Sequence, residues 1–256
     1  MKIGIIGLGV VGSAVKIAFE HEGYTTYCYD KKDSRTSIKD LLGTDCIFVC
    51  VPTDTVNQHC DVSQVTSVVN ELSLNLYQGL IIIKSTVIPG TTQSLIDQYP
   101  ALRLCFVPEF LRQDHAVDDF TQNHQVLIVG TWSQKDFHLV TQLHSMYSQH
   151  AQMISPTEAE LTKYFVNVYN CLRIVFANNF YKVCSHYGAN YDKVLAAAVS
   201  RPAVGHDHYL VCNENMQGYS GKCLPKDITA FQSLLAQIDP KIELFRSVIK
   251  DNEKYI

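Results

Sequence analysis

Hydrophobic and polar positions in the first 155 residues form short apolar runs separated by longer amphipathic stretches. The apolar runs are rich in Val and Ile and mostly lack alternation, which is typical of strands covered on both faces. Amphipathic stretches such as Val11–Glu22 and Val62–Leu74 lie between them. This alternation predicts an α/β fold with a doubly wound parallel sheet. The predicted strands are Lys2–Ile6, Thr25–Tyr29, Cys46–Val51, Leu80–Lys84, Leu104–Val107, Val126–Val129 and Ala151–Ile154.

The pattern becomes helical after residue 155. Residues 155–158, Ser-Pro-Thr-Glu, combine a capping hydroxyl, a proline at the first helical position and an acid in the first turn. The helix that they begin is predicted to continue to about His186, and Gly188 is a plausible stop. Residues 201–222 are predicted as a loop. We therefore predict two domains, residues 1–155 and an all-helical region at residues 156–256. The further predicted helices are Tyr191–Val199, Lys226–Gln237 and Ile242–Lys254.

Composition excludes several classes of partner. The chain has 256 residues, of which 46% are hydrophobic and 18% charged, as in a globular protein with a sizeable core. The net charge of −4 and the lack of a basic face argue against nucleic acid binding. No apolar run reaches the roughly 18 residues of a membrane-spanning helix, so no membrane partner is expected.

The nine cysteines are scattered through apolar runs and form no CxxC pair or metal-ligand spacing. Such a distribution predicts reduced, mostly buried thiols in a cytoplasmic protein without a metal site.

The sequence "GLGVVG" places Gly7, Gly9 and Gly12 between a predicted strand and a predicted helix. In a Rossmann domain these glycines permit a tight turn, the approach of a pyrophosphate and close helix–strand packing. Asp30 ends the second strand, where a carboxylate accepts hydrogen bonds from ribose hydroxyls and repels a 2′-phosphate. We therefore predict NAD as cofactor, although Lys31, Lys32 and Arg35 could accommodate the phosphate of NADP.

Two loops, "VPTD" and "KSTVIPGTT", follow the third and fourth strands at the same edge of the sheet. Thr53, Ser85 and Thr86 are candidates for contact with nicotinamide or ribose. Turn capping is an equally good explanation of each of these hydroxyls taken alone.

Three later stretches carry further candidate chemistry. "VPEFLR" puts Glu109 directly after a strand, and "AELTKYFVNVYN" puts Lys163 and Asn167 on one helix face. "GYSGKCLPKD" holds Cys223 between two lysines, which favour a thiolate, and after glycines, which allow a substrate to approach. Taken singly, each stretch is better explained as an ordinary surface or turn feature.

The order of the motifs GLGVVG, VPTD, KSTVIPGTT, VPEFLR, AELTKYFVN and GKCLPKD resembles that of the UDP-glucose/GDP-mannose dehydrogenase family. The resemblance runs from Met1 to about Ile256 and is strongest to members that act on UDP-glucose. Other dehydrogenases with a similar first domain lack the cysteine motif.

The resemblance implies a polysaccharide-biosynthesis enzyme that oxidises a sugar's primary alcohol to a carboxylate, with two hydride transfers to NAD. Its expected substrate is UDP-glucose and its product UDP-glucuronate. Cys223 is then the nucleophile, passing through a thiohemiacetal and a thioester. Lys163 would stabilise the oxyanion with help from Asn167, Asp227 would orient water or Lys163, and Glu109 would activate water. Thr86 would act near the reacting hydroxyl through water.

The resemblance also implies the binding residues and an assembly. Expected cofactor contacts are Gly7, Gly9, Val11, Gly12, Asp30, Arg35, Thr53, Thr86 and Lys226, of which Lys226 would reach the pyrophosphate. Expected substrate contacts are Glu109, Phe110, Leu111, Lys163, Asn167, Tyr219 and Gly221. The long helix after the dinucleotide domain is expected to form a homodimer.

The sequence departs from the family pattern in three places. Ser220 and Gln217 stand where the family usually has glycine and phenylalanine. The sequence ends where the family's third, nucleotide-binding domain is expected to begin, so we expect that domain to be absent. Which nucleotide sugar is used, whether two domains suffice and the oligomeric state do not follow from the residues.

Two other functions fit part of the pattern. A hydroxyacid dehydrogenase of the 3-hydroxyisobutyrate or 6-phosphogluconate kind would share the dinucleotide domain and the helix lysine but would need no cysteine. A non-catalytic NAD-binding remnant would have no chemical need for the six candidate catalytic residues together.

Overall fold

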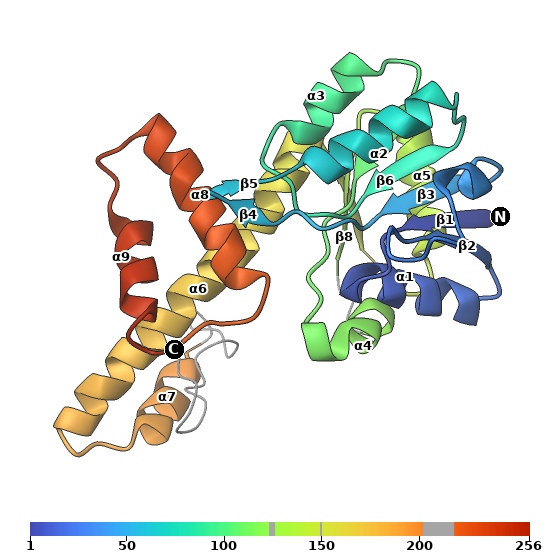
Figure 1. The fold of residues 1–256 in the computed structure, drawn as a ribbon. Coiled ribbons are helices and arrows are strands. Elements are labelled where there is room, and N and C mark those ends of the chain that lie inside the picture. The colour runs from blue at the N-terminus through green and yellow to red at the C-terminus, as the bar shows by residue number, and fades with distance from the viewer. Residues whose placement is uncertain (123–125, 149, 202–217) are drawn as a thin grey trace. The chain divides into compact units, whose positions relative to one another are not determined.

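The computed structural model describes residues 1–122, 126–148, 150–201 and 218–256 (Figure 1). The chain separates into two compact units, each described here by itself. The first contains residues 1–54 and 61–163, and the second contains residues 55–60 and 164–256.

The first unit is built on a sheet of seven strands in the order β2-β1-β3-β6-β7-β8-β9. The order reverses beside β1, because β2 pairs on one side of it and β3 on the other. In such sheets the carboxyl ends of the strands at the reversal form the crevice in which nucleotides bind. The strands are β1 (Lys2–Ile6), β2 (Thr25–Tyr29), β3 (Cys46–Val49), β6 (Leu80–Ile83), β7 (Arg103–Phe106), β8 (Leu127–Gly130) and β9 (Ala151–Ile154).

The sheet departs from the fully parallel arrangement predicted from the sequence at one junction. Phe106 of β7 faces Gly130 of β8 in an antiparallel pair, and β9 then lies parallel to β8. Strand periodicity does not encode direction, so the pattern of apolar runs could not reveal this reversal.

Helices cover both faces of the sheet (Figure 1). Alternate residues of β6 belong to different apolar clusters: Leu80 and Ile82 pack on one face and Ile81 and Ile83 on the other. This double burial explains why the strands read as unbroken apolar runs. The covering elements are α1 (Val10–His21), η1 (Ile38–Leu41), α2 (Ser63–Leu74), α3 (Thr91–Gln98), η2 (Gln113–His115), α4 (Ala116–Thr121) and α5 (Gln134–Leu143).

The second unit is mostly helical, as predicted. Its helices are α6 (Pro156–His186, which begins in the first unit), α7 (Tyr191–Val199), α8 (Leu224–Ile238) and α9 (Leu244–Asn252). Its core joins Val168 and Val175 of α6 to Tyr219, Ile228 of α8 and Val248 of α9.

A short hairpin, β4 (Thr55–Val56) and β5 (His59–Cys60), groups with the second unit although it follows β3 in the sequence. The Thr55 hydroxyl donates to the carbonyl of Lys226 at 3.1 Å, and His59 Nδ1 lies 3.1 Å from the hydroxyl of Ser233. The division therefore differs from the single cut at residue 155 that the sequence suggested, and two-residue strands give no periodicity by which to predict it.

Candidate active site

The glycine-rich turn after β1 has the geometry that a dinucleotide requires. Gly7 has a φ of 90°, and a Cβ there would lie 2.6 Å from the carbonyl oxygen of Cys50. A Cβ on Gly12 would lie 1.9 Å from the carbonyl oxygen of Gly7, whereas a Cβ on Gly9 would meet no atom of the described part of the chain within 4 Å. Gly7 and Gly12 thus bring backbone segments together, and Gly9 leaves open space beside the first turn of α1, where Val11 lies.

Asp30 is positioned to complete a ribose site. Its carboxylate accepts from the backbone N–H of Leu8 at 2.7 Å and of Lys32 at 2.9 Å, which ties the end of β2 to the glycine-rich turn. These hydrogen bonds, that of Lys32 first, lower the pKa of Asp30. Arg35 instead pairs with Asp33 at 2.8 Å on the surface. The open glycine backbone and the ionised Asp30 together fit the phosphate and ribose groups of NAD.

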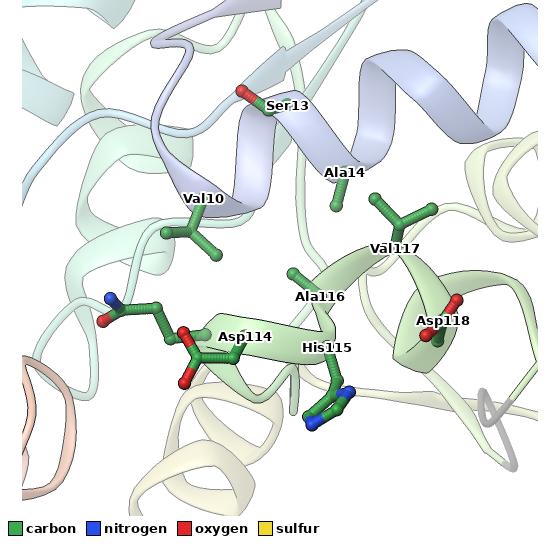
Figure 2. A pocket seen from close by; sticks show the side chains of 9 residues that line it. Val10, Ser13, Ala14, Asp114, His115, Ala116, Val117 and Asp118 are labelled. Atoms are coloured by element: carbon green, nitrogen blue, oxygen red, sulfur yellow. The ribbon is translucent and has the colours of Figure 1, made fainter.

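A pocket of about 280 Å³ lies against the same helix (Figure 2). Val10, Ser13 and Ala14 of α1 form one wall, and residues 113–118 of η2 and α4 form the other. Asp114 and Asp118 are among the lining side chains, so an anionic phosphate is disfavoured there. The pocket therefore does not replace the glycine-rich turn as the expected place of the pyrophosphate.

The candidate hydroxyls after β3 and β6 are all buried. Ser85 donates to the carbonyl of Val51 at 2.7 Å, which is the turn-capping role considered for it. Thr53 and Thr86 are 6% and 9% exposed.

Glu109 and Lys163 form a buried ion pair, with Oε1 and Nζ 3.1 Å apart. Lys163 also donates to the backbone carbonyl of Glu109, and the other carboxylate oxygen accepts from the N–H of Leu111 at 2.8 Å. Burial alone would raise the pKa of Glu109, but the Lys163 ammonium and the Leu111 N–H hold it below its ordinary value. The Lys163 ammonium also lies 5.4 Å from the ring centroid of Phe110, which is exposed. The structure thus joins four of the predicted residues in one charged group.

Lys84 belongs to the same region but was not singled out in the sequence. Its side chain is 2% exposed, and among the residues that the structure describes its Nζ has no hydrogen-bond partner. It continues the alternation of β6 onto the face of Leu80 and Ile82, and its Nζ lies 5.7 Å from the ring centroid of Phe120. The sequence held one signal for a buried lysine: in the run "LIIIK", Lys84 follows Leu80 and Ile82 at the same two-residue spacing, which places it on their face of the sheet.

Cys223 occupies the N-cap of α8 and is exposed. Its carbonyl accepts from the N–H of Asp227 at 2.9 Å, and Pro225 lies in the first turn. The thiol-bearing residue therefore stands where the positive end of the helix dipole favours an anion, the thiolate included.

Asp227 is fully buried and both of its oxygens are engaged. It accepts from Asn167 Nδ2 at 2.6 Å and from Lys226 Nζ at 2.5 Å. Lys226, expected at the cofactor pyrophosphate, is here an ion-pair partner of Asp227. Asn167, Lys226 and Asp227 thus form a second charged group, within the helical unit.

The loop before Cys223 contains the other predicted substrate contacts. Tyr219 is buried, whereas Ser220 and Gly221 are exposed, and Gly221 has a φ of 78° that favours glycine. Gln217, noted above as a departure from the family pattern, and most of the predicted 201–222 loop lie outside the described residues.

In the part of the chain that the structure describes, no helix combines the length and the apolar character needed to cross a membrane.

Comparison with known families matches both parts of the chain. Residues 33–150 match the NAD binding domain of the UDP-glucose/GDP-mannose dehydrogenase family, and residues 157–254 match its central domain. The two ranges meet near residue 155 and together account for most of the chain.

Similar proteins bear related names. A UDP-glucose 6-dehydrogenase of Rickettsia typhi is 26% identical, with 99% of this chain and 67% of that protein covered. The UDP-glucose 6-dehydrogenase TuaD of Bacillus subtilis is 27% identical, with 99% of this chain and 63% of that protein covered. The chain thus spans about two thirds of the length of these relatives.

Solved structures share the fold. A UDP-glucose dehydrogenase from Pyrobaculum islandicum has a TM-score of 0.89 at 22% identity and covers 99% of this chain and 68% of its own. A 3-hydroxyisobutyrate dehydrogenase from Mycobacterium tuberculosis has a TM-score of 0.77 at 11% identity and covers 99% of this chain and 92% of its own.

Proposed function

The chain belongs to the UDP-glucose/GDP-mannose dehydrogenase family, and from this premise we propose that it oxidises UDP-glucose to UDP-glucuronate with NAD. The observation that carries the proposal is the exposed Cys223 at the start of α8, held by a helix whose first turn contains the buried Asp227. The names of the relatives support UDP-glucose as the substrate.

The residues of the first unit suit NAD. Gly7, Gly9 and Gly12 would accept the pyrophosphate against the backbone of α1, with Val11 in its first turn, and Asp30 would accept hydrogen bonds from the ribose hydroxyls. Thr53 and Thr86, at the carboxyl ends of β3 and β6, would line the nicotinamide side. NAD supplies the hydride acceptor for each of the two oxidations.

Cys223 explains how an aldehyde becomes a carboxylate. Its thiolate would add to the aldehyde carbon, forming a C–S bond and an oxyanion that takes a proton to give a thiohemiacetal. Loss of a hydride and of the hydroxyl proton would leave a thioester. Water would then add, the C–S bond would break, and the electron pair would return to sulfur while a proton is released with the carboxylate.

The two charged groups would assist these steps. Lys163 would stabilise the oxyanion, and for that its ammonium must exchange its bonds to Glu109 for bonds to the substrate. Glu109, whose lowered pKa keeps it ionised, would then accept a proton from the attacking water. Asn167 and Lys226 hold Asp227, so the buried carboxylate would keep both residues aligned at the start of α8.

The test is the stoichiometry of the reaction. Purified chain is incubated with NAD and UDP-glucose, and reduced cofactor and sugar products are counted. We expect two reduced nicotinamides per sugar and UDP-glucuronate as product. Release of one per sugar would reject the double oxidation, and exclusive turnover of GDP-mannose would correct the substrate.

A cysteine pair provides the matched control. Cys223→Ser should abolish formation of the acid, whereas Cys28→Ser, at a half-buried cysteine on β2, should leave it intact. A hydroxyacid dehydrogenase, whose fold the chain shares, would keep its single oxidation in both variants. In a non-catalytic remnant, Cys223 would react with iodoacetamide no faster than an exposed model thiol.

A homodimer through α6 forms part of the proposal. Phe165 and Tyr169 stack at a centroid distance of 6.3 Å, and Phe176 and Phe180 pack at 5.8 Å. These four rings are exposed along α6, and Tyr187, in the turn just after its end, is exposed as well. Aromatic surface of this extent on a helix is typical of a protein–protein interface.

A further inference from the structure

The chain just before Cys223 is clamped by the side chain of Asn252, the last residue of α9. Asn252 Oδ1 accepts from the backbone N–H of Tyr219 at 2.7 Å, and Asn252 Nδ2 donates to the carbonyl of Tyr219 at 3.0 Å. The asparagine is 3% exposed. Both backbone groups of one residue are therefore bound by one buried amide, which fixes the position and the direction of the chain there.

The neighbouring Gly218 makes this close approach possible. A Cβ on Gly218 would lie 2.6 Å from Asn252 Oδ1 and 3.1 Å from Tyr255 Cβ. The N–H of Gly218 donates to the carbonyl of Tyr255 at 3.2 Å. The Tyr219 ring is buried in the core of the unit, so the register of residues 218–219 is fixed by hydrogen bonds and by packing.

The C-terminal end of α9 is itself anchored on α6. The hydroxyl of Tyr255 donates to Asn179 Oδ1, and Asn179 Nδ2 lies 3.3 Å from Asp251 Oδ2. The Lys182 ammonium lies 4.3 Å from the ring centroid of Tyr255. The clamp is thus attached to the longest helix of the chain.

Between Tyr219 and Cys223 lie three exposed residues, 220–222. They include Gly221 in the left-handed region, and exposed side chains restrict a backbone little. The path of the backbone into Cys223 therefore depends on the anchors at its two ends, which are Tyr219 before it and the first turn of α8 after it.

We propose that Asn252 is a positioning residue for Cys223. By binding both backbone groups of Tyr219, it fixes the point from which residues 220–222 lead to Cys223, and so fixes the position of the thiol relative to the substrate carbon. The catalytic part of this inference rests on the proposed function. A misplacement of about 1 Å lowers the rate of an enzyme about 100-fold, so the loss of the clamp should act on the rate.

The first test compares Asn252→Ala with Val248→Ala, which removes packing from the same core cluster but leaves both hydrogen bonds of Tyr219 in place. In Asn252→Ala we expect kcat to fall about 100-fold while KM for NAD changes less than twofold. Hydrogen exchange in the peptide of residues 218–223 should be at least tenfold faster. Val248→Ala, compared at the same margin below its melting temperature, should retain the wild-type kcat and exchange.

The second test uses Asn252→Asp as a pH-dependent rescue. An ionised carboxylate accepts from the Tyr219 N–H but cannot donate to the Tyr219 carbonyl, whereas a protonated carboxyl does both. The kcat of this variant relative to wild type should therefore rise as pH falls through the pKa of the new carboxyl. The same ratio for Asn252→Ala should stay flat. A flat ratio for Asn252→Asp would overturn the hydrogen-bonding role.

Alkylation of Cys223 by iodoacetamide separates this inference from the proposed function. If the wild-type chain oxidises no nucleotide sugar, the function fails, but the clamp is still supported by an alkylation rate that changes at least threefold in Asn252→Ala and not in Val248→Ala. Unchanged exchange and alkylation in Asn252→Ala would overturn the clamp. Faster exchange with an unchanged kcat in an active enzyme would overturn its role in positioning.

Discussion

Lys84 is a buried lysine that directly follows the apolar strand β6, at a position where an apolar side chain is expected. Its ammonium lies on the α1 and α4 face of the central sheet, where the preceding positions of β6 are Leu and Ile. Burial lowers the pKa of Lys84, and nearby Cys50 and Glu109 only partly oppose that effect. A site near Glu109 thus keeps a cation that the core disfavours, which is typical of functional regions.

Lys84→Met should stabilise the protein by about 1 to 3 kcal/mol at neutral pH, because methionine fills the site without a desolvation penalty. The folded-state pKa of Lys84 is below the unfolded value of about 10.4, so between the two the unfolded chain binds more protons and wild-type stability rises with pH. The advantage of methionine should therefore shrink toward about pH 10. Urea unfolding of the wild type and of Lys84→Met from pH 7 to pH 10 measures this difference in the free energy of unfolding.

The exposed Lys31→Met serves as the control for that experiment and should change the free energy of unfolding by less than about 0.5 kcal/mol. A gain in Lys84→Met that is equal at every pH would show that burial of charge is not its cause.

At the scale of elements, the β4–β5 hairpin has an unfavourable turn. Asn57 and Gln58 have φ values of 51° and 67°, the left-handed values that a two-residue hairpin loop requires. Asparagine tolerates that region, whereas glutamine there destabilises the folded state by about 1 kcal/mol or more, because its Cβ is crowded by the backbone.

Gln58→Gly should therefore raise the free energy of unfolding by about 0.5 to 1 kcal/mol, since the steric relief exceeds the entropy that glycine loses on folding. The equilibrium unfolding midpoint in urea is the measurement. Asn57→Gly is the matched comparison and should give a smaller gain. A loss of stability in Gln58→Gly would mean that the glutamine side chain contributes more than its backbone costs.

At the scale of the whole molecule, the elements with a strong period were the ones that the sequence predicted well. β1, β2, β9, α6 and α7 lie within one residue of their expected bounds. The strand–helix alternation predicted the doubly wound sheet. Elements without a repeating pattern, such as the β4–β5 hairpin, and the direction of β8 required three-dimensional contacts.

The candidate site was predictable to a similar extent. The glycine turn, Asp30 and the Lys163 and Cys223 motifs are local in sequence, so their spacing indicated them. The hydrogen bonds of Asn252 to Tyr219 join positions 33 residues apart, and no local spacing marks such a pair. Asp227 is likewise hydrogen-bonded to Asn167, which lies 60 residues before it in the sequence. Sequence motifs could not predict this contact either.

Assembly also belongs to this scale. Phe176→Glu should weaken the proposed homodimer and shift sedimentation toward the monomer at low micromolar concentration, because the ring is 58% exposed on α6. Leu74→Glu, at a 76% exposed position at the end of α2, should leave the dimer intact. Monomer as the only species of the wild-type chain at all concentrations would reject the dimer.

The contacts of the hairpin also determine when it can fold during synthesis of the chain. Thr55 finds its hydrogen-bond partner at Lys226, 171 residues later. At ribosomal rates of about 5 to 20 residues per second, that partner is made roughly 10 to 30 s after the hairpin. Two-residue strands are not stable alone. The sheet of the first unit must therefore assemble around a loop that stays unfolded until α8 has been made.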